Sequence, residues 1–559
     1  MSRRVSLPTR LRGDCFVDQG IISHCTNIPG RKFQTAFVLL ACAFISACSS
    51  LPPGHDYPRI ASSAMSHPEE TALGARLEEV SREHDGNSGF FLQSFGADGY
   101  LTRMQMINAA ERTLDLQYFI LRGDDSGRLL TDAALRAADR GVRVRLLIDD
   151  GETIAGDEQI APLAAHHSVE IRIFNPFRYR GYKKSIKAAE FLLNKSRLNY
   201  RMHNKLLVVD NSVALVGGRN IGDQYFQVDA EEQYADSDVF AVGPIVRQLS
   251  ASFDEFWNHA LSIPNEALTS GKTSRTALSE HRELTIEEPA EVNPDGIDFV
   301  QRVDSGEPFI GMLSGRLPLV WAPARLISDS PDKKSVKEGT RVGRLMLRPV
   351  AVATSAVQSE LLMVTPYMVP GKEGMQLIND LRRRNVRVRI LTNSLESSTV
   401  VFAHSGYMGY RVPLLEDGVE LYEIRSQLGN TRGSGQTAAM SRHGTYSLHA
   451  KMFVFDRQSI FVGPMNFDMR SMHLNTEIGL LIDSSELAEE LARRFEAMVQ
   501  PANAYELRLQ PNKSGHGQHL IWRTLEGEKL VDIQKEPAQS AWQKFSAGFL
   551  FLLPLDKEL

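Results

Sequence analysis

One short pattern of residues occurs twice in the 559-residue chain, with the same internal spacing. The first copy, YRMHNKLLVVDNSVALVGGRN, spans residues 200–220, and the second, YSLHAKMFVFDRQSIFVGPMN, spans residues 446–466. Both follow the spacing H-x-K-x4-D-x6-G-x2-N, and the second lies 246 positions after the first. A long-range repeat indicates that a structural unit is duplicated. The chain is therefore expected to contain two halves of one fold.

The residues before each copy predict what that fold is. The stretch RGVRVRLL begins at residue 140, and a similar stretch, RNVRVRIL, begins at residue 384. In both halves such a strand follows a helical segment, SGRLLTDAALRAADRG or GKEGMQLINDLRRRN, and an earlier strand, AAERTLDLQYFI or SELLMVTPYMV. Strands that alternate with helices indicate βαβ units. We expect an α/β protein, with two domains of mixed β-sheet packed about a pseudo-twofold axis and one shared active site.

Changes in composition along the chain suggest six segments. The two domains are expected to be large enough for separate cores. The expected boundaries are 1–48 for a signal and lipobox region, 49–90 for a tether, 91–264 for the first domain, 265–345 for a linker with an insertion, 346–500 for the second domain, and 501–559 for a membrane-proximal tail.

The cysteines and the net charge narrow the class of protein. The four cysteines, Cys15, Cys25, Cys42 and Cys48, all precede residue 49, so the rest of the chain has no disulfide, thiol nucleophile or cysteine metal site. The formal net charge of −5 disfavours a general nucleic-acid binder, which would have a basic surface. We therefore expect no nucleic-acid partner.

The N-terminal region has the features of an export signal. Two basic residues precede an apolar stretch from 33 to 47, which is too short to span a bilayer comfortably. It ends in Ile-Ser-Ala-Cys48, which resembles a bacterial lipobox, in which the cysteine is lipidated. An ordinary signal anchor is the alternative. The expected location is the bacterial cell envelope, at the periplasmic face of the inner or outer membrane.

The repeated motif predicts chemistry on a phosphodiester. If the halves meet about a twofold axis, His203 and His449 converge on one cleft together with two lysines and two asparagines. Lysine and asparagine donate hydrogen bonds to phosphate oxygens, and one histidine can attack phosphorus while the other protonates the leaving oxygen. Neither histidine has the spacing of a zinc site, so no metal and no cofactor are expected. The phosphate-binding candidates are Lys205, Lys451, Asn220 and Asn466.

Acidic residues complete the predicted site. Each histidine needs an acceptor on its second ring nitrogen to fix its tautomer. Glu477 and Asp238 begin matching apolar strands and are the expected acceptors, with Asp236 as the alternative to Asp238. We group Asp210 and Asp456 with the catalytic residues of the motif, although their favoured role is to hold a turn through hydrogen bonds to the backbone.

The double motif resembles that of the phospholipase D superfamily. Further stretches resemble the C-type bacterial cardiolipin synthases, among them FNPF, DSDVFAVGP, PLVWAPARLISDSPDKK, HSGYMGYRVPLLEDGVELYEI and EPAQSAWQKFSAGFLFLLPLDKEL. The resemblance implies two α/β domains with seven- to nine-stranded mixed sheets that face each other across one active site. It also makes His404 and Tyr407 candidates to line the cleft.

The resemblance further implies a reaction. A phospholipid would form a phosphatidyl-histidine intermediate, and phosphatidylglycerol would accept the phosphatidyl group to give cardiolipin. By analogy His203 is the nucleophile and His449 the general acid; the reverse order is the alternative. The implied partners are phosphatidylglycerol and phosphatidylethanolamine, with an accessory protein left open. Water as acceptor would give a phospholipase D, and a nuclease is a third, less favoured class. A lipid-binding protein without activity would need a broken motif, whereas both copies are intact.

The C-terminal stretch FSAGFLFLLPL, residues 545–555, is apolar but too short to span a bilayer. Trp542 and Lys544 precede it, which favours a helix that lies in the headgroup region of a membrane. A buried core helix is the alternative.

Overall fold

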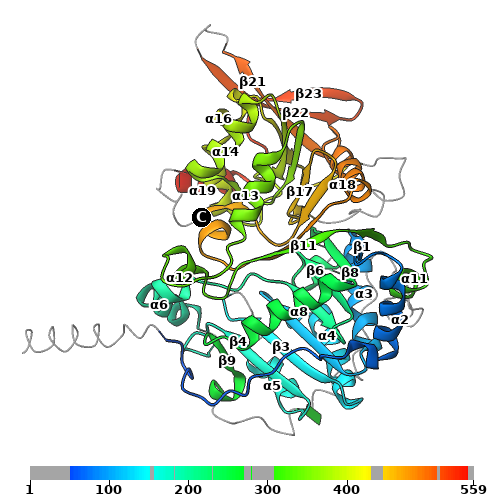
Figure 1. Ribbon diagram of the computed structural model, residues 1–559. Helices are drawn as coiled ribbons and strands as arrows, with labels where there is room; N and C mark the ends of the chain where they lie inside the picture. The colour runs from blue at the N-terminus through cyan, green and yellow to red at the C-terminus, as the bar shows by residue number, and fades with distance from the viewer. Residues whose placement is uncertain are drawn as a thin grey trace, which may run out of the picture. The chain divides into compact units, whose positions relative to one another are not determined.

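The computed structural model describes residues 51–151, 157–181, 183–228, 231–269, 278–279, 308–429, 445–512 and 517–551. Cys48 and the lipobox lie outside these residues, as do the other three cysteines. The first half of the chain, coloured blue to green, and the second half, coloured yellow-green to red, each contain a β-sheet with helices on its faces (Figure 1).

The first half contains a nine-stranded mixed sheet within the described residues. Three adjacent strands, β2, β3 and β4, are parallel, as expected for βαβ units, and the remaining neighbours are antiparallel. In spatial order the strands are β10 (Val320–Ala322), β1 (Ser88–Gln93), β8 (Asp238–Val242), β6 (Val213–Gly217), β5 (Leu206–Val209), β2 (Thr113–Tyr118), β3 (Arg143–Asp149), β4 (Val169–Phe174) and β9 (Ser262–Pro264).

The second half repeats this arrangement in a ten-stranded sheet of described residues. Strands β11, β20, β18, β17, β12, β14, β15 and β21 take the positions of β1, β8, β6, β5, β2, β3, β4 and β9. The order is β11 (Ala324–Ser328), β20 (Ile478–Ile482), β18 (Ser459–Val462), β17 (Met452–Phe455), β12 (Glu360–Val364), β14 (Arg387–Asn393), β15 (Glu420–Ile424), β21 (Ala504–Pro511), β22 (Gln518–Glu526) and β23 (Lys529–Ile533). The predicted duplicated α/β fold is confirmed.

Helices cover both faces of each sheet. Alternation along a strand directs successive side chains to opposite faces, so Val208 of β5 packs with α8 while Leu207 packs with α3 and α4. The helices used below are α2 (Ala72–Arg82), α3 (Gly96–Ala109), α4 (Asp125–Asp139), α5 (Asp157–Ala164), α6 (Lys184–Leu193), α7 (Lys195–Leu198), α8 (Pro244–Trp257), α11 (Phe309–Leu313), α12 (Lys333–Lys337), α13 (Leu347–Ala356), α14 (Gly371–Arg383), α15 (Val401–Met408), α16 (Arg411–Glu416), α17 (Met469–His473), α18 (Ser485–Met498) and α19 (Ala541–Phe551).

One hydrophobic core extends across the two halves. The cluster that contains Val208 and Phe253 of the first half also contains Leu362 and Leu491 of the second half. It therefore joins the α8 side of the first sheet to the α18 side of the second. Apolar burial of this kind is the dominant favourable term in association, so the halves fold as partners rather than as loosely tethered domains.

The structure differs from the expected boundaries in three places. The expected tether contains α2, which buries Leu73 and Leu77 in the core of the first half. The expected linker contains β10 and β11, which are edge strands of the first and second sheets, separated only by Pro323. The expected tail contains β21, β22 and β23, which extend the second sheet. The strands β10 and β11 have only three and five residues, which is too short for a clear alternating pattern in the sequence.

The C-terminal stretch forms α19, which has eleven described residues. Among the helices of the described chain, none combines the length and the apolar composition that crossing a bilayer requires.

The two motif aspartates hold the turn after each motif strand. Asp210 and Asp456 have φ values of 51° and 52°, and the residue that follows each of them also has a positive φ, as in the tight turns of β-hairpins. The Asp210 carboxylate accepts hydrogen bonds from the backbone N–H of Glu111, Arg112 and Thr113 at 2.9, 2.8 and 2.7 Å. Asp456 accepts the equivalent bonds at the start of β12.

The whole length of β5 separates Asp210 from Lys205, and β17 separates Asp456 from Lys451. The carboxylates therefore lie at the opposite end of each strand from the histidines. Grouping these aspartates with the catalytic residues is wrong, and their hydrogen bonds are those of a turn-holding role.

We predict that Asp210→Asn lowers the free energy of unfolding by about 1–3 kcal/mol, because the amide NH2 that replaces the carboxylate Oδ2 cannot accept the hydrogen bond from the Glu111 backbone N–H. Denaturant titration would measure the loss. The matched control is Asp380→Asn, whose carboxylate is 52% exposed in an ion pair with Arg383. The kcat of the folded Asp210→Asn protein should stay within about twofold of the parent, and a large loss of kcat without a loss of stability would contradict the turn-holding role.

Candidate active site

Backbone pairing between the halves fixes the position of both motif histidines. A short strand of the first half, β7 (Glu232–Ala235), pairs in parallel with β16 (Thr445–Leu448) of the second half, directly before His449. The His449 backbone N–H donates to the Ala235 carbonyl at 2.7 Å. In the same way Met202 forms a parallel bridge with Thr476, and the His203 backbone N–H donates to the Thr476 carbonyl at 2.9 Å.

His203 is oriented by an acid of the second half. Its Nδ1 lies 2.9 Å from Oε2 of Glu477, whose side chain is fully buried. Lys205 Nζ donates a hydrogen bond to the His203 carbonyl oxygen at 2.7 Å. The ring of Phe119 packs edge-on against the imidazole, with 4.9 Å between ring centroids.

His449 is oriented by an acid of the first half. Its Nδ1 lies 2.5 Å from Oδ2 of Asp236, and Lys451 donates from Nζ to the His449 carbonyl oxygen. Two tyrosines of the first half enclose the imidazole: Tyr234 stacks on it at 5.5 Å, and Tyr225 meets it edge-on at 5.3 Å. Each histidine thus takes its acid from the opposite half, so neither half alone contains a complete site.

The expectation that Asp238 orients a histidine is wrong. Its carboxylate is fully buried between two arginines, 2.9 Å from Arg103 and 3.1 Å from Arg219. Asp238 already belongs to β8, whereas the pairing of β7 with the second half ends at Ala235 and leaves the adjacent Asp236 beside His449. Asp236, the alternative in the sequence, therefore takes this place.

Burial and the lysine pair set the charges of the site. Burial, reinforced by Lys205 and Lys451, lowers the pKa of His203 well below its usual value. Burial and Lys451 lower the pKa of His449 to about 4. Both imidazoles are thus neutral near pH 7 before an anion binds, while burial lowers the pKa of Lys451 to about 8 and leaves it largely cationic.

The two orienting acids differ in their ionisation. Burial raises the pKa of Glu477 to about 7. Burial also disfavours the Asp236 carboxylate, but Lys451 and His449 outweigh it and lower the pKa of that group. At neutral pH Asp236 is therefore fully ionised beside His449. Glu477, beside His203, is present in both its protonated and its ionised form. An ionised partner stabilises an imidazolium, so the pair with Asp236 is the better proton carrier.

The two motif asparagines lie in unequal environments. Asn220 accepts from the Ile120 backbone N–H at 3.1 Å and donates from its Nδ2 to the Tyr225 hydroxyl at 2.9 Å, so it supports the ring that packs on His449. The Asn466 side chain is buried, and its Oδ1 has no hydrogen-bond partner among the described residues. Asn466 is the one with unused hydrogen-bonding capacity for a ligand.

Sequence reasoning missed some neighbours of the histidines and misplaced others. Tyr225 and Tyr234 carry no motif spacing that would have marked them. His404 and Tyr407 are buried in α15, and His404 Nε2 lies 2.8 Å from Oε1 of Glu536; that they line the cleft stays a prediction.

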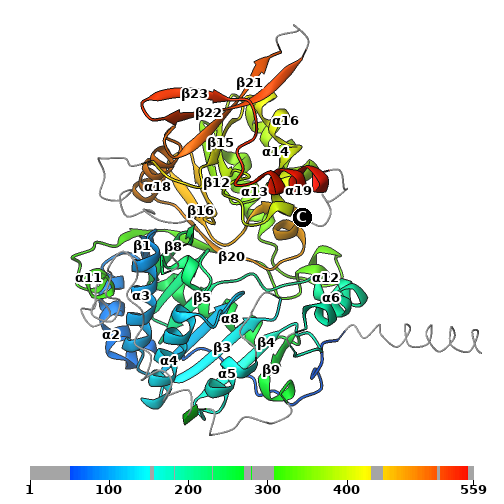
Figure 2. The same cartoon turned by 180° about the vertical axis from the view of Figure 1, so that it is seen from behind.

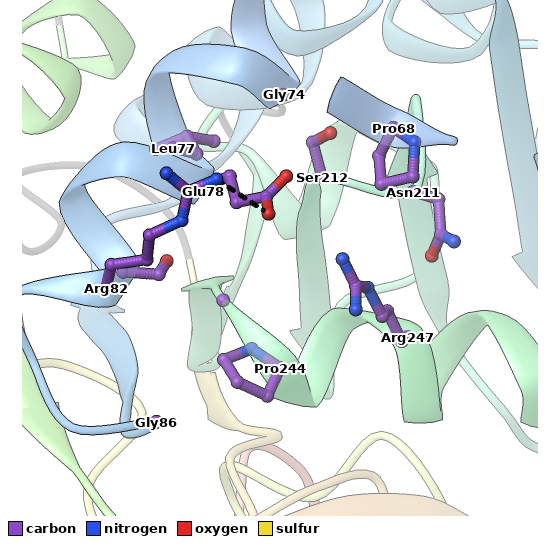
Figure 3. A pocket seen from close by; sticks show the side chains of 12 residues that line it. Pro68, Gly74, Leu77, Glu78, Arg82, Gly86, Asn211, Ser212, Pro244 and Arg247 are labelled. Atoms are coloured by element: carbon purple, nitrogen blue, oxygen red, sulfur yellow. Dashed lines mark hydrogen bonds and ion pairs between the residues drawn. The ribbon is translucent and has the colours of Figure 1, made fainter. Parts of the chain in front are cut away.

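Two hollows are lined by described residues. A cavity of about 530 Å³ lies beside the second motif and is lined by Asp236 and by Leu448, Ala450 and Met452, which alternate with His449 and Lys451 along the chain. A hollow of about 280 Å³ lies between α2 and α8, where Leu77, Arg82 and Arg247 are among the residues that line it (Figure 3). The second hollow shares no lining residue with the histidine site.

Comparison with known proteins agrees with this geometry. The family model described as "Cardiolipin synthase, PLD-like domain" matches residues 104–257 and 352–499, one match in each half. The chain belongs to this phospholipase D-like family. It is an enzyme of the phosphatidyltransferase and phospholipase D type.

Individual relatives cover most of the chain. It is 36% identical to cardiolipin synthase C of Escherichia coli (strain K12) over 490 residues, which are 87% of this chain and 99% of that protein. It is 25% identical over 419 residues to the cardiolipin synthase of Alkalihalophilus pseudofirmus, covering 75% of this chain and 67% of that protein. The crystal structure of phosphatidylserine synthase from Haemophilus influenzae Rd KW20 aligns with 77% of this chain and 92% of its own, at a TM-score of 0.49 and 14% identity.

We predict that substitution of Asp236 lowers activity, whereas substitution of Asp238 lowers stability. Asp236→Asn should lower kcat on a phosphodiester substrate by about 10²–10⁴, because His449 loses its charged acceptor, while the melting temperature stays near that of the parent. Asp238→Asn should instead destabilise the fold, by about 3–5 kcal/mol, because two buried arginines lose a charged partner. Steady-state kinetics and thermal denaturation of both proteins would measure this. A normal kcat in Asp236→Asn would contradict the assignment.

Proposed function

We propose that the enzyme transfers a phosphatidyl group from one phospholipid to the free glycerol hydroxyl of phosphatidylglycerol and so makes cardiolipin. The observation that carries the proposal is the pair of buried neutral histidines, each held through Nδ1 by an acid of the opposite half and flanked by a lysine. This arrangement supplies one nucleophile and one proton carrier on two sides of a single anionic group.

In the first step His203 acts as the nucleophile. Its Nε2 attacks the phosphorus of the donor lipid, and the bond from phosphorus to the head-group oxygen breaks. His449 gives a proton to that oxygen, so the head group leaves as an alcohol. The Lys205 and Lys451 ammonium groups stabilise the charge on the phosphoryl oxygens in the transition state, which is worth more in a buried site than in water.

In the second step the acceptor lipid replaces the head group. The terminal hydroxyl of phosphatidylglycerol gives its proton to His449 and attacks phosphorus, and the bond to His203 breaks. The products are cardiolipin and the free enzyme. With water in place of the acceptor, the same steps give phosphatidic acid, so hydrolysis is the second candidate function. Phosphatidylglycerol and phosphatidylethanolamine are the proposed donors.

Lipidation of Cys48 would attach the enzyme to a membrane of the cell envelope, with the catalytic halves at the periplasmic face. The lipobox-like residues before Cys48 support this placement. A single attachment point leaves the orientation of the catalytic halves open, so a second contact with the membrane is expected.

Product analysis tests the proposal directly. Purified enzyme in vesicles of phosphatidylglycerol, with or without phosphatidylethanolamine, should form cardiolipin detected by mass spectrometry, and EDTA should leave the rate unchanged because lysines supply the positive charge. The His203→Ala protein is the matched control. Phosphatidic acid alone would favour the hydrolase. Cleavage of oligonucleotides without lipid turnover would move the enzyme to the nuclease class, and a rate that EDTA abolishes and a metal restores would contradict the site chemistry.

The assignment of the two histidines is predicted to appear in a single-turnover experiment. With a donor that carries p-nitrophenol as its head group, the leaving group needs no proton, so His449→Ala should release one equivalent of p-nitrophenol and retain labelled phosphatidyl on the protein. His203→Ala should give no burst and no label. The opposite pattern would make His449 the nucleophile.

A further inference from the structure

The helix α19 presents aromatic side chains to solvent. Trp542, Phe545 and Phe549 lie three and four residues apart, on one helical face, and are 73%, 63% and 57% exposed. Their rings stack along the helix, with centroids 5.5 and 6.5 Å apart. Apolar residues of this size are seldom exposed as a contiguous stripe on a soluble surface, so the stripe indicates a partner.

The opposite face of α19 is held in place. Ala547 is buried, α19 packs against α15, and Gln543 donates from Nε2 to the Leu395 carbonyl oxygen at 2.7 Å. Just before the helix, Glu536 accepts a hydrogen bond from buried Arg411 at 2.6 Å. The helix is therefore fixed with its aromatic face outward, and the exposure of the three rings is a property of the fold.

A second exposed apolar helix belongs to the first half. None of the ten described residues of α6 is buried. Ile186, Leu192 and Leu193 are 41%, 73% and 58% exposed. Glu190 accepts hydrogen bonds from the backbone N–H of Arg178 and Tyr179, which attach α6 to the segment before it.

Short chain connections link each helix to residues near the motif histidines. The chain passes from α6 through α7 to His203, and Asn199 on this path accepts a hydrogen bond from Arg470 of the second half at 2.6 Å. On the other side, Thr399, two residues before α15, interacts with Tyr234, the ring that stacks on His449. Figures 1 and 2 show α6 and α19 toward the same side of the picture, above and below the junction of the halves.

Positive charges border the apolar residues. Lys183 and Lys184 are exposed at the start of α6, and Lys544, which precedes Phe545 in the sequence, is exposed on α19. Apolar and aromatic side chains flanked by lysines are typical of helices that lie in the headgroup region of an anionic bilayer. A protein interface would instead tend to exclude lysine from its centre.

We propose that α6 and α19 together form the surface by which the enzyme docks on a bilayer that contains anionic phospholipids. The proposal rests on the lipid substrates of the proposed function. One helix from each half enters the headgroup region, and the cleft with both histidines then faces the membrane between them. Two separate contacts fix an orientation that a single attachment at Cys48 does not, and their affinities combine.

The test uses the full chain with Cys48→Ala, which removes the lipid anchor. The α19 variant is Trp542→Ser with Phe545→Ser and Phe549→Ser, and the α6 variant is Ile186→Ser with Leu192→Ser and Leu193→Ser. The matched control is Val352→Ser with Leu530→Ser, which removes apolar side chains that are 70% and 60% exposed on α13 and β23. Binding is measured by flotation with vesicles of phosphatidylglycerol and phosphatidylethanolamine, and activity with a soluble p-nitrophenyl phosphodiester.

We expect each helix variant to bind vesicles at least tenfold more weakly than the parent, with soluble-substrate activity and melting temperature unchanged, and the control to bind as the parent does. Lys183→Gln with Lys184→Gln should weaken binding by about fivefold per lysine and only on anionic vesicles. Unchanged vesicle binding by both helix variants would overturn the proposal. So would a parent protein that is dimeric in solution and becomes monomeric in these variants, because the surface would then bind a second copy.

Failure of the proposed function has a different signature. If the wild-type enzyme turns over no phospholipid but vesicle binding still depends on the two helices, the docking surface is supported and the proposed reaction is contradicted. If cardiolipin forms and the helix variants bind and react on vesicles as the parent does, the proposed reaction is supported and the docking surface is contradicted.

Discussion

The exchange of acids between the halves is the constraint on which the site depends. Glu477 of the second half orients His203, and Asp236 of the first half orients His449. Parallel backbone pairing beside each histidine, between β7 and β16 and between Met202 and Thr476, fixes these contacts. A shift of one half against the other would break both contacts at once. The shared hydrophobic core is therefore a requirement of catalysis as well as of stability.

The same arrangement explains why the site tolerates several buried charges. Lys205 and Lys451 are almost fully buried, which normally disfavours an ammonium group. Each donates a hydrogen bond to the carbonyl oxygen of its own motif histidine, and each lies in the field of acids from both halves. The remaining desolvation cost of the two ammonium groups lowers the pKa of both lysines. An anionic phosphoryl group would pair with these charges and offset that cost, which favours binding of the substrate.

The sequence was sufficient to predict what repeats locally. The motif spacing and the matching βαβ segments indicated two α/β halves, and the hairpin turn at Asp210 followed from residues close in the chain. Prediction from the sequence failed for contacts that depend on backbone pairing between the two halves. Asp236 and Asp238 are two positions apart, and only the end of β7 against β16 shows which one reaches His449. The edge strands β10, β11 and β23 are only three to five residues long, too short for a clear alternating pattern, and the stacking of Tyr234 on His449 has no local signal.

The lowered pKa values bear on the order of events in catalysis. A general acid must carry a proton, yet burial and Lys451 keep His449 neutral in the free enzyme, with a pKa of about 4. A bound phosphodiester adds a negative charge beside both lysines and so offsets the repulsion that lowers this pKa. Ionised Asp236 on Nδ1 then stabilises the imidazolium. His203, beside a Glu477 whose pKa is about 7, gains less from its acid, which agrees with its proposed role as a neutral nucleophile. In the proposed reaction the substrate anion would convert His449 into the acid, and the difference between Asp236 and Glu477 would decide this order.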